Sequence, residues 1–169
     1  MYQSTMAGLD ATFPPWTIYY HSSNESKWGI GTFQTTGPMN TWRKFFSIIE
    51  ELKADTFSDG MFFLMRDPIP PLWENCNNVY GGAYSFRVIK KDAGEAFVSY
   101  GIAAILGLLT TDTANTINGI SISTKKTHNI IKVWNTNSAK HRSPTDLFKL
   151  LPDMKTEDVL YTPFTEKKM

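Results

Sequence analysis

Cysteine is nearly absent from this chain of 169 residues, since Cys76 is the only one. No disulfide can form within the chain, which excludes the small disulfide-stabilised secreted domains and favours a reducing compartment such as the cytoplasm. No apolar run reaches the roughly 18 residues of a membrane-spanning helix. The first residues lack a basic segment followed by an apolar one, so we expect no secretory signal and no membrane partner.

An excess of charge of one sign is also missing. The formal net charge is only +1, in a chain that is 41% hydrophobic and 20% charged. This composition is ordinary for a globular domain, and it excludes a protein that coats nucleic acid through its overall charge. The length suits one domain with a single core. We interpret residues 1–13 as a flexible N-terminal arm and residues 14–169 as that single domain.

The sequence contains no nucleophile elbow, no Walker loop and no paired metal-ligand motif. Its three histidines are scattered among carboxylates that form no cluster. We therefore predict a binding protein rather than an enzyme, with no metal and no cofactor.

Aromatic residues are plentiful, and one of them stands in an unusual loop. Pro68, Pro70 and Pro71 exclude a regular helix or central strand, so they predict a stiff loop after the apolar run 60–65. This loop carries Trp73 beside Glu74. An indole face next to a carboxylate suits a flat cationic ligand with N–H donors on its edge. The alternative is structural, with Trp73 packed inward and Glu74 acting as a cap.

A basic sector follows later in the chain. Residues 113–145 contain no Asp or Glu, and they include Lys125, Lys126 and Lys132. A basic sector in a nearly neutral protein favours a local anion such as a phosphate chain. The alternative is a solvated hairpin tip.

The hydrophobic pattern predicts an α+β domain. Apolar residues at helical spacing predict the buried face of a helix that Asn40 or Thr41 caps, and they are Trp42, Phe45, Phe46, Ile49 and Leu52. Further helices are predicted at 93–108 and from Ser143, where Pro144 follows a capping serine. Strands are predicted at 16–21, 30–36, 60–66, 84–90, 120–124, 130–134 and 159–164. We expect a curved, mostly antiparallel sheet of about seven strands, with three helices on its convex face and ligand-binding loops on its concave side.

From about Trp16 to Phe164 the chain resembles the translation initiation factor 4E family of mRNA cap-binding proteins. The resemblance rests on motifs that occur in the family's order: Ser26-Lys27-Trp28, residues 67–74, Gly81-Gly82-Ala83-Tyr84, residues 97–107 and 119–125, and Val133-Trp134. The short form is similar to the compact versions found in kinetoplastid protozoa.

The resemblance implies a binding site for the 7-methylguanosine cap. It implies that Trp28 and Trp73 sandwich the methylated base, that Glu74 accepts hydrogen bonds from its edge, and that Trp134 contacts the methyl group. It also implies phosphate contacts from Lys125, supported by Lys126 or Lys132. The function implied is that of a cytoplasmic cap-binding subunit in translation initiation, with capped mRNA, including hypermethylated caps, as ligand. The alternatives are a cap-binding translational repressor and a generic single-stranded RNA-binding module that stacks bases on aromatic rings.

The resemblance further implies a protein partner, either an adaptor of the initiation factor 4G type or a repressor. Arg43 falls where the family presents a tryptophan to such partners, and the second helix offers small residues there. The partner-binding residues expected on this basis, in an altered contact, are Met39, Trp42, Arg43, Ser99 and Ala103.

Overall fold

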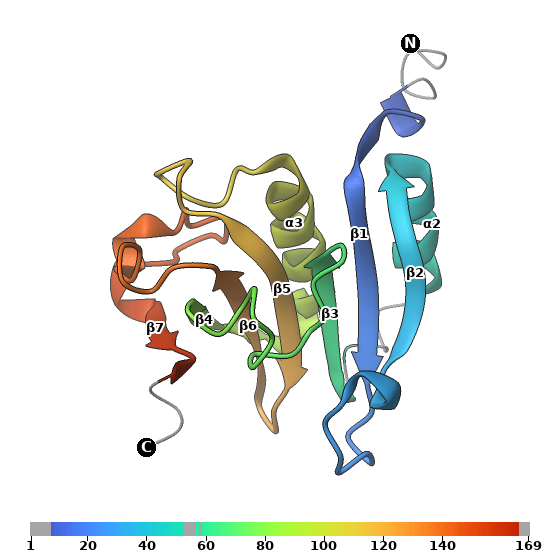
Figure 1. Cartoon of the computed structure of the whole chain (residues 1–169), viewed down its shortest axis with the longest axis horizontal. Helices are drawn as coiled ribbons and strands as arrows, with labels where there is room; N and C mark the ends of the chain where they lie inside the picture. The colour runs from blue at the N-terminus through green and yellow to red at the C-terminus, as the bar shows by residue number, and fades with distance from the viewer. Residues whose placement is uncertain (1–7, 53–56, 58, 166–169) are drawn as a thin grey trace.

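The computed structural model describes residues 8–52, 57 and 59–165. Residues 1–7 of the predicted N-terminal arm lie outside the described residues. Seven strands form one sheet in the order β2-β1-β3-β5-β6-β4-β7, and all neighbouring strands are antiparallel. Figure 1 shows this curved sheet with α2 and α3 behind it, which confirms the predicted α+β class. None of the helices in this part of the chain has the length and apolar character that a membrane crossing requires.

The strands are β1 (Thr12–His21), β2 (Gln34–Thr41), β3 (Met61–Arg66), β4 (Gly82–Ile89), β5 (Ile117–Thr124), β6 (His128–Asn135) and β7 (Leu160–Pro163). The α-helices are α2 (Trp42–Glu51) and α3 (Ala93–Leu106). Short 3-10 turns are η1 (Ile30–Thr32), η3 (Lys90–Asp92), η4 (Pro144–Asp146) and η5 (Thr156–Asp158).

Strand β3 is buried on both of its faces, because successive side chains of a strand point to opposite sides of the sheet. Phe62 and Leu64 belong to the core that the sheet shares with the helices. Phe63 and Met65 belong to a second cluster on the other face, which we call the front cluster. Its buried members are Phe63, Met65, Ile69, Ala83, Trp134 and Phe164. The face without helices therefore has its own apolar base, on which a loop can rest.

The predicted helix at Ser143 is wrong. Ser143 does cap a turn, since its Oγ accepts from Thr145 N at 3.3 Å, but the turn is only η4. Leu147 then forms an isolated bridge with Thr110, and Phe148 N donates to Leu109 O at 2.9 Å. The backbone groups that would have continued a helix are thus satisfied by a neighbouring segment.

The predicted strand 30–36 is displaced along the chain. Its first residues form η1, and β2 instead begins at Gln34 and continues through Pro38 to Thr41. Strand β2 is at the sheet edge, where β1 is its single partner among the described strands, so a proline that cannot donate is tolerated there. At its end Thr41 caps α2 as predicted, because its Oγ1 accepts from Lys44 N at 3.2 Å.

Candidate functional site

A cavity of about 400 Å³ lies on the front face of the sheet, between β3, β5, β6 and the loop of residues 67–81, which we call the Trp73 loop. Every predicted ligand-binding residue except Lys126 lines it. The lining residues are Trp28, Met61, Phe63, Pro71, Leu72, Trp73, Glu74, Ser121, Ser123, Lys125, Lys132, Trp134 and Phe164. Segments far apart in the sequence therefore meet at one opening.

Hydrogen bonds from buried asparagines hold the Trp73 loop. Asn78 is completely buried, and its Nδ2 donates to Pro70 O at 3.1 Å and to Leu72 O at 2.9 Å. Asn118, buried in β5, donates from Nδ2 to Asn78 Oδ1 at 3.0 Å. The Arg66 guanidinium donates in turn to Asn118 Oδ1 at 2.7 Å. These hydrogen bonds attach the loop to the sheet at Pro70 and Leu72, the residues that precede Trp73.

Trp73 and Glu74 differ in their exposure. Trp73 is half-buried and packs against the front cluster, whereas Glu74 is exposed at the rim of the cavity. Asn75 N donates to Leu72 O at 3.1 Å, so the backbone turns at this pair. The arrangement combines an apolar ring surface with an anionic acceptor at the same opening.

Trp28 is supported from beneath by a histidine ring. The two rings are parallel, with 3.8 Å between centroids and 3° between planes. His21 is only 2% exposed, and its Nε2 lies 2.9 Å from Lys27 O, which a ring N–H at that position can reach as a donor. Trp28 remains 54% exposed. One face of its indole is therefore held by His21, while much of its surface is available to a ligand.

Trp134 forms the floor of the cavity. It is 6% exposed, and its Nε1 donates to Ser121 Oγ at 3.2 Å. Its ring packs at an angle against Phe63, at 5.9 Å and 88°, and against Phe164, at 5.0 Å and 60°. Because its N–H is already bonded, Trp134 offers a ligand ring surface rather than a donor.

Cations lie on β6 and on the hairpin that joins it to β5. Lys132 stands on β6 opposite Ser121 and lines the cavity, and exposed Lys125 directly follows β5. Lys126 is exposed on the same hairpin. Within residues 8–52, 57 and 59–165, no group of three or more His, Cys, Asp or Glu could hold a metal ion. The cavity thus combines aromatic surfaces, one carboxylate and at least two cations.

The residues expected to bind a protein partner do not form one exposed surface. Met39 is fully buried, so the expectation that it contacts a partner directly is corrected. Ala103 is 9% exposed, and half-buried Trp42 packs against Phe13 at 4.8 Å. Ser99 is exposed.

Arg43 is exposed but is already engaged by the chain itself. Its Nε donates to Asp10 Oδ1 at 2.8 Å, and this hydrogen bond lowers the pKa of the Asp10 carboxyl. One turn along α2, Phe46 is 39% exposed, although the helical pattern predicted a buried position. The outer side of α2 therefore presents an exposed aromatic ring that sequence reasoning missed.

Comparisons of the sequence and of the structure with known proteins lead to the same group of proteins. The sequence profile of the family Eukaryotic initiation factor 4E matches residues 13–166. The chain is similar to Ascaris suum eIF4E-3, solved with an m7G cap, at 20% identity and a TM-score of 0.66, over 78% of this chain and 76% of that one. The same Ascaris protein, also at 20% identity, a TM-score of 0.66 and coverage of 78% and 76%, has been solved with an m2,2,7G cap.

Two further structures have the same fold. C. elegans eIF4E-3, in complex with the 4E-binding protein Mextli and a cap analog, is 16% identical with a TM-score of 0.67, over 78% of this chain and 76% of that one. A schistosome eIF4E, complexed with m7GpppA and 4E-BP, is 17% identical with a TM-score of 0.66, over 78% and 74%. At such identities the structures establish a common fold, and the sequence profile covers most of the chain.

Proposed function

Since the chain belongs to the eukaryotic initiation factor 4E family, we propose that its front cavity binds the 7-methylguanosine cap of mRNA for translation initiation. The observation that carries the proposal is that Trp28, Trp73 and Glu74, from two separate loops, line a single cavity. The family is one of binding proteins, so the chain is not an enzyme. A cytoplasmic location accompanies this role.

The proposed contacts follow from the chemistry of the base. Methylation at N7 makes guanine cationic, so stacking between Trp28 and Trp73 gains a cation–π contribution of about 2 kcal/mol in a desolvated slot. Glu74 accepts from N1–H and the 2-amino group, in charge-assisted hydrogen bonds worth about 1.5–3 kcal/mol. Trp134 contacts the methyl group from the floor. Neutral guanine loses the cationic contribution, so selectivity arises from charge as well as shape.

Free nucleotides test the proposal without RNA. 7-Methyl-GTP should quench tryptophan fluorescence at concentrations where GTP does not, and the protein should be retained on 7-methyl-GTP resin. A generic single-stranded RNA-binding module would instead bind uncapped oligonucleotides and ignore the nucleotide. That result would replace the cap-binding proposal with this alternative.

His21 should matter for affinity although it lies behind Trp28. His21→Ala removes the ring that holds the indole, and an aromatic pair contributes about 0.5–1.5 kcal/mol. We expect 7-methyl-GTP affinity to fall by up to about tenfold, while His21→Phe retains most of it. Fluorescence titration of the three proteins measures this. Equal affinities throughout would mean that Trp28 keeps its orientation without a ring beneath it.

The cations should bind the phosphate chain. Affinity should fall from 7-methyl-GTP to 7-methyl-GMP, and fall with added salt. Lys125→Ala should weaken triphosphate binding by up to about fivefold, since an exposed ion pair contributes about 0.2–1 kcal/mol. Lys91→Ala is a matched control, because Lys91 is exposed on η3 and does not line the cavity. If the unmodified protein bound both analogues with equal affinity, the hairpin would not be part of the binding site.

A protein partner is proposed for the outer side of α2, either an adaptor of the 4G type or a repressor. Phe46 supports this, because interface energy concentrates in a few aromatic anchors. The contact would be altered at Arg43, since an acidic group of the partner has to displace Asp10. Adding the protein to a capped-mRNA translation assay separates the roles, because an initiation subunit stimulates translation and a repressor inhibits it.

A further inference from the structure

Strand β4 is fully paired on one side but only partly paired on the other. It pairs with β6 along its whole length, from Gly82 to Ile89. On its other side it pairs with β7 only from Gly82 to Ser85. Among the described residues, no strand continues this pairing along Phe86–Ile89. The outer half of β4 is therefore an open sheet edge.

The direction of the backbone groups on that edge follows from the hydrogen bonds nearby. Gly82 N donates to Asn135 Oδ1 on the β6 side, and Gly81 O accepts from Phe164 N on the β7 side. Successive residues of an antiparallel strand direct their backbone N–H and C=O groups alternately to the two neighbouring strands. In β4 the backbone groups of the odd-numbered residues therefore point away from β6, to the side where β7 lies. Arg87 thus directs its N–H and C=O groups, and Ile89 its N–H group, towards the open edge, whereas the C=O of Ile89 begins the turn η3.

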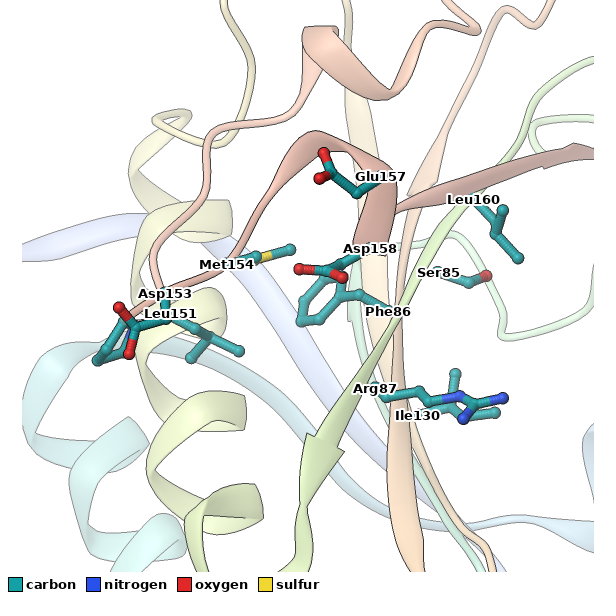
Figure 2. A pocket seen from close by; sticks show the side chains of 11 residues that line it. Ser85, Phe86, Arg87, Ile130, Leu151, Asp153, Met154, Glu157, Asp158 and Leu160 are labelled. Carbon is teal, nitrogen blue, oxygen red and sulfur yellow. The ribbon is translucent and has the colours of Figure 1, made fainter.

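A groove follows this edge. A cavity of about 590 Å³ lies between β4 and the segment 151–160, and a second of about 510 Å³ continues it towards α3. The two share Arg87, Leu151, Pro152 and Asp153, so we treat them as one β4-edge groove. Figure 2 shows Leu151, Met154 and Phe86 along the groove, with Asp158 between Met154 and Phe86 and with Glu157 above them.

The groove is acidic in a protein whose net charge is +1. Its carboxylates are Asp92, Glu95, Asp153, Glu157 and Asp158. Within the described residues, Arg87 is the single basic side chain that lines it, and Figure 2 shows this side chain directed away from Asp153, beside Ile130. A polypeptide that enters the groove meets apolar surface at its centre and negative charge at its margin.

We propose that the β4-edge groove binds an extended basic segment of a partner protein, which adds to the sheet as a strand beside β4. The N–H and C=O groups of Arg87 and the N–H group of Ile89 pair with its backbone, as in other cases of strand addition. Side chains of such a strand alternate between the two faces of the sheet, and those on the face of Phe86 extend along Leu151 and Met154. Lys or Arg at these positions packs its aliphatic part there and reaches the carboxylates of the same face with its charged end. Only about four residues pair, which predicts a weak, reversible contact.

The position of the groove separates this contact from the proposed cap and adaptor sites. In the sheet order β4 lies near one end, next to β7, whereas β2 lies at the opposite end beside α2. None of the groove residues lines the front cavity. A basic strand in the groove can therefore be bound together with a cap.

A labelled synthetic peptide that alternates Lys with Val tests the proposal, with a Glu-Val peptide as its counterpart. The amide resonances of residues 86–89 should shift on addition of the Lys peptide, and fluorescence anisotropy should report saturable binding. The Glu peptide should not bind. Absence of binding by the Lys peptide, or equal binding by both, would overturn the proposal.

A single substitution tests the backbone pairing. Ile89→Pro removes one outward N–H, and the native φ of −65° at Ile89 already fits proline. Affinity should fall by about fivefold, the value of one hydrogen bond, whereas Ile89→Ala keeps the N–H and should bind like the unmodified protein. If circular dichroism shows that Ile89→Pro does not fold, Glu157→Lys replaces it in the test. Reversing this charge at the margin of the groove should lower the affinity for the Lys peptide. Unchanged affinity in the folded variant would exclude strand addition.

Discussion

Trp73→Ala should reduce affinity for 7-methyl-GTP by about 1–3 kcal/mol, the usual contribution of one base–aromatic stack. The indole lies half-buried on the front cluster and lines the same cavity as Trp28. Because the loop is anchored by Asn78 and Asn118, the substitution should leave its backbone in position. Fluorescence titration or calorimetry measures the loss, and GTP binding should change much less.

Tyr80→Ala provides the matched control for this prediction. Tyr80 is an aromatic residue of the same loop, it is 74% exposed, and it does not line the cavity. Its carbonyl accepts from Ser138, a bond that the substitution leaves in place. Retention of Trp73→Ala on cap resin at the level of Tyr80→Ala would contradict the stack.

Glu74→Gln should also cost about 1.5–3 kcal/mol of cap affinity, since it removes the charge and turns N–H donors towards a guanine edge that itself donates. Glu74 is exposed, so the circular dichroism spectrum should be unchanged. Glu51→Gln, at the exposed end of α2, is the control.

A methylated cap analogue sharpens this test. Two methyl groups on N2 leave only N1–H as a donor for Glu74, so Glu74→Gln should cost less affinity for the m2,2,7G cap than for the m7G cap. Unfolding of Glu74→Gln would instead assign the residue a structural role.

Much of the site could be predicted because its residues carry local signals. The prolines around Trp73 predict a loop, and the basic hairpin contains Lys125 and Lys126 within a strand–turn–strand pattern. The supporting contacts carry no such signal. Asn78 bonds to Asn118, which is 40 residues away in the sequence, and Arg66 bonds to Asn118 across 52 residues. An asparagine at the start of an apolar strand, as Asn118 is in β5, is a reason to look for a buried partner, but the pattern does not identify which one.

The errors in the fold have a common cause. Ser143-Pro144 is a proper helix start, yet the backbone beyond it bonds to Leu109 and Thr110 instead of to itself. Phe46 fits the apolar stripe of α2 but lies at its margin, because the sheet accepts Phe45 fully and leaves the next residue outside. In both places the local sequence favours the predicted structure, but tertiary contacts outweigh this preference.

The anchoring of the Trp73 loop also determines when its conformational entropy is lost. Fixing one residue costs about 1–2 kcal/mol, and here that loss is incurred during folding, when Asn78 and Asn118 bond beneath the loop. A ligand that arrives later meets a loop whose backbone is already ordered. More of the stacking and hydrogen-bond energy then remains as net affinity, so even a small ligand such as one capped nucleotide can be held without the rest of the RNA.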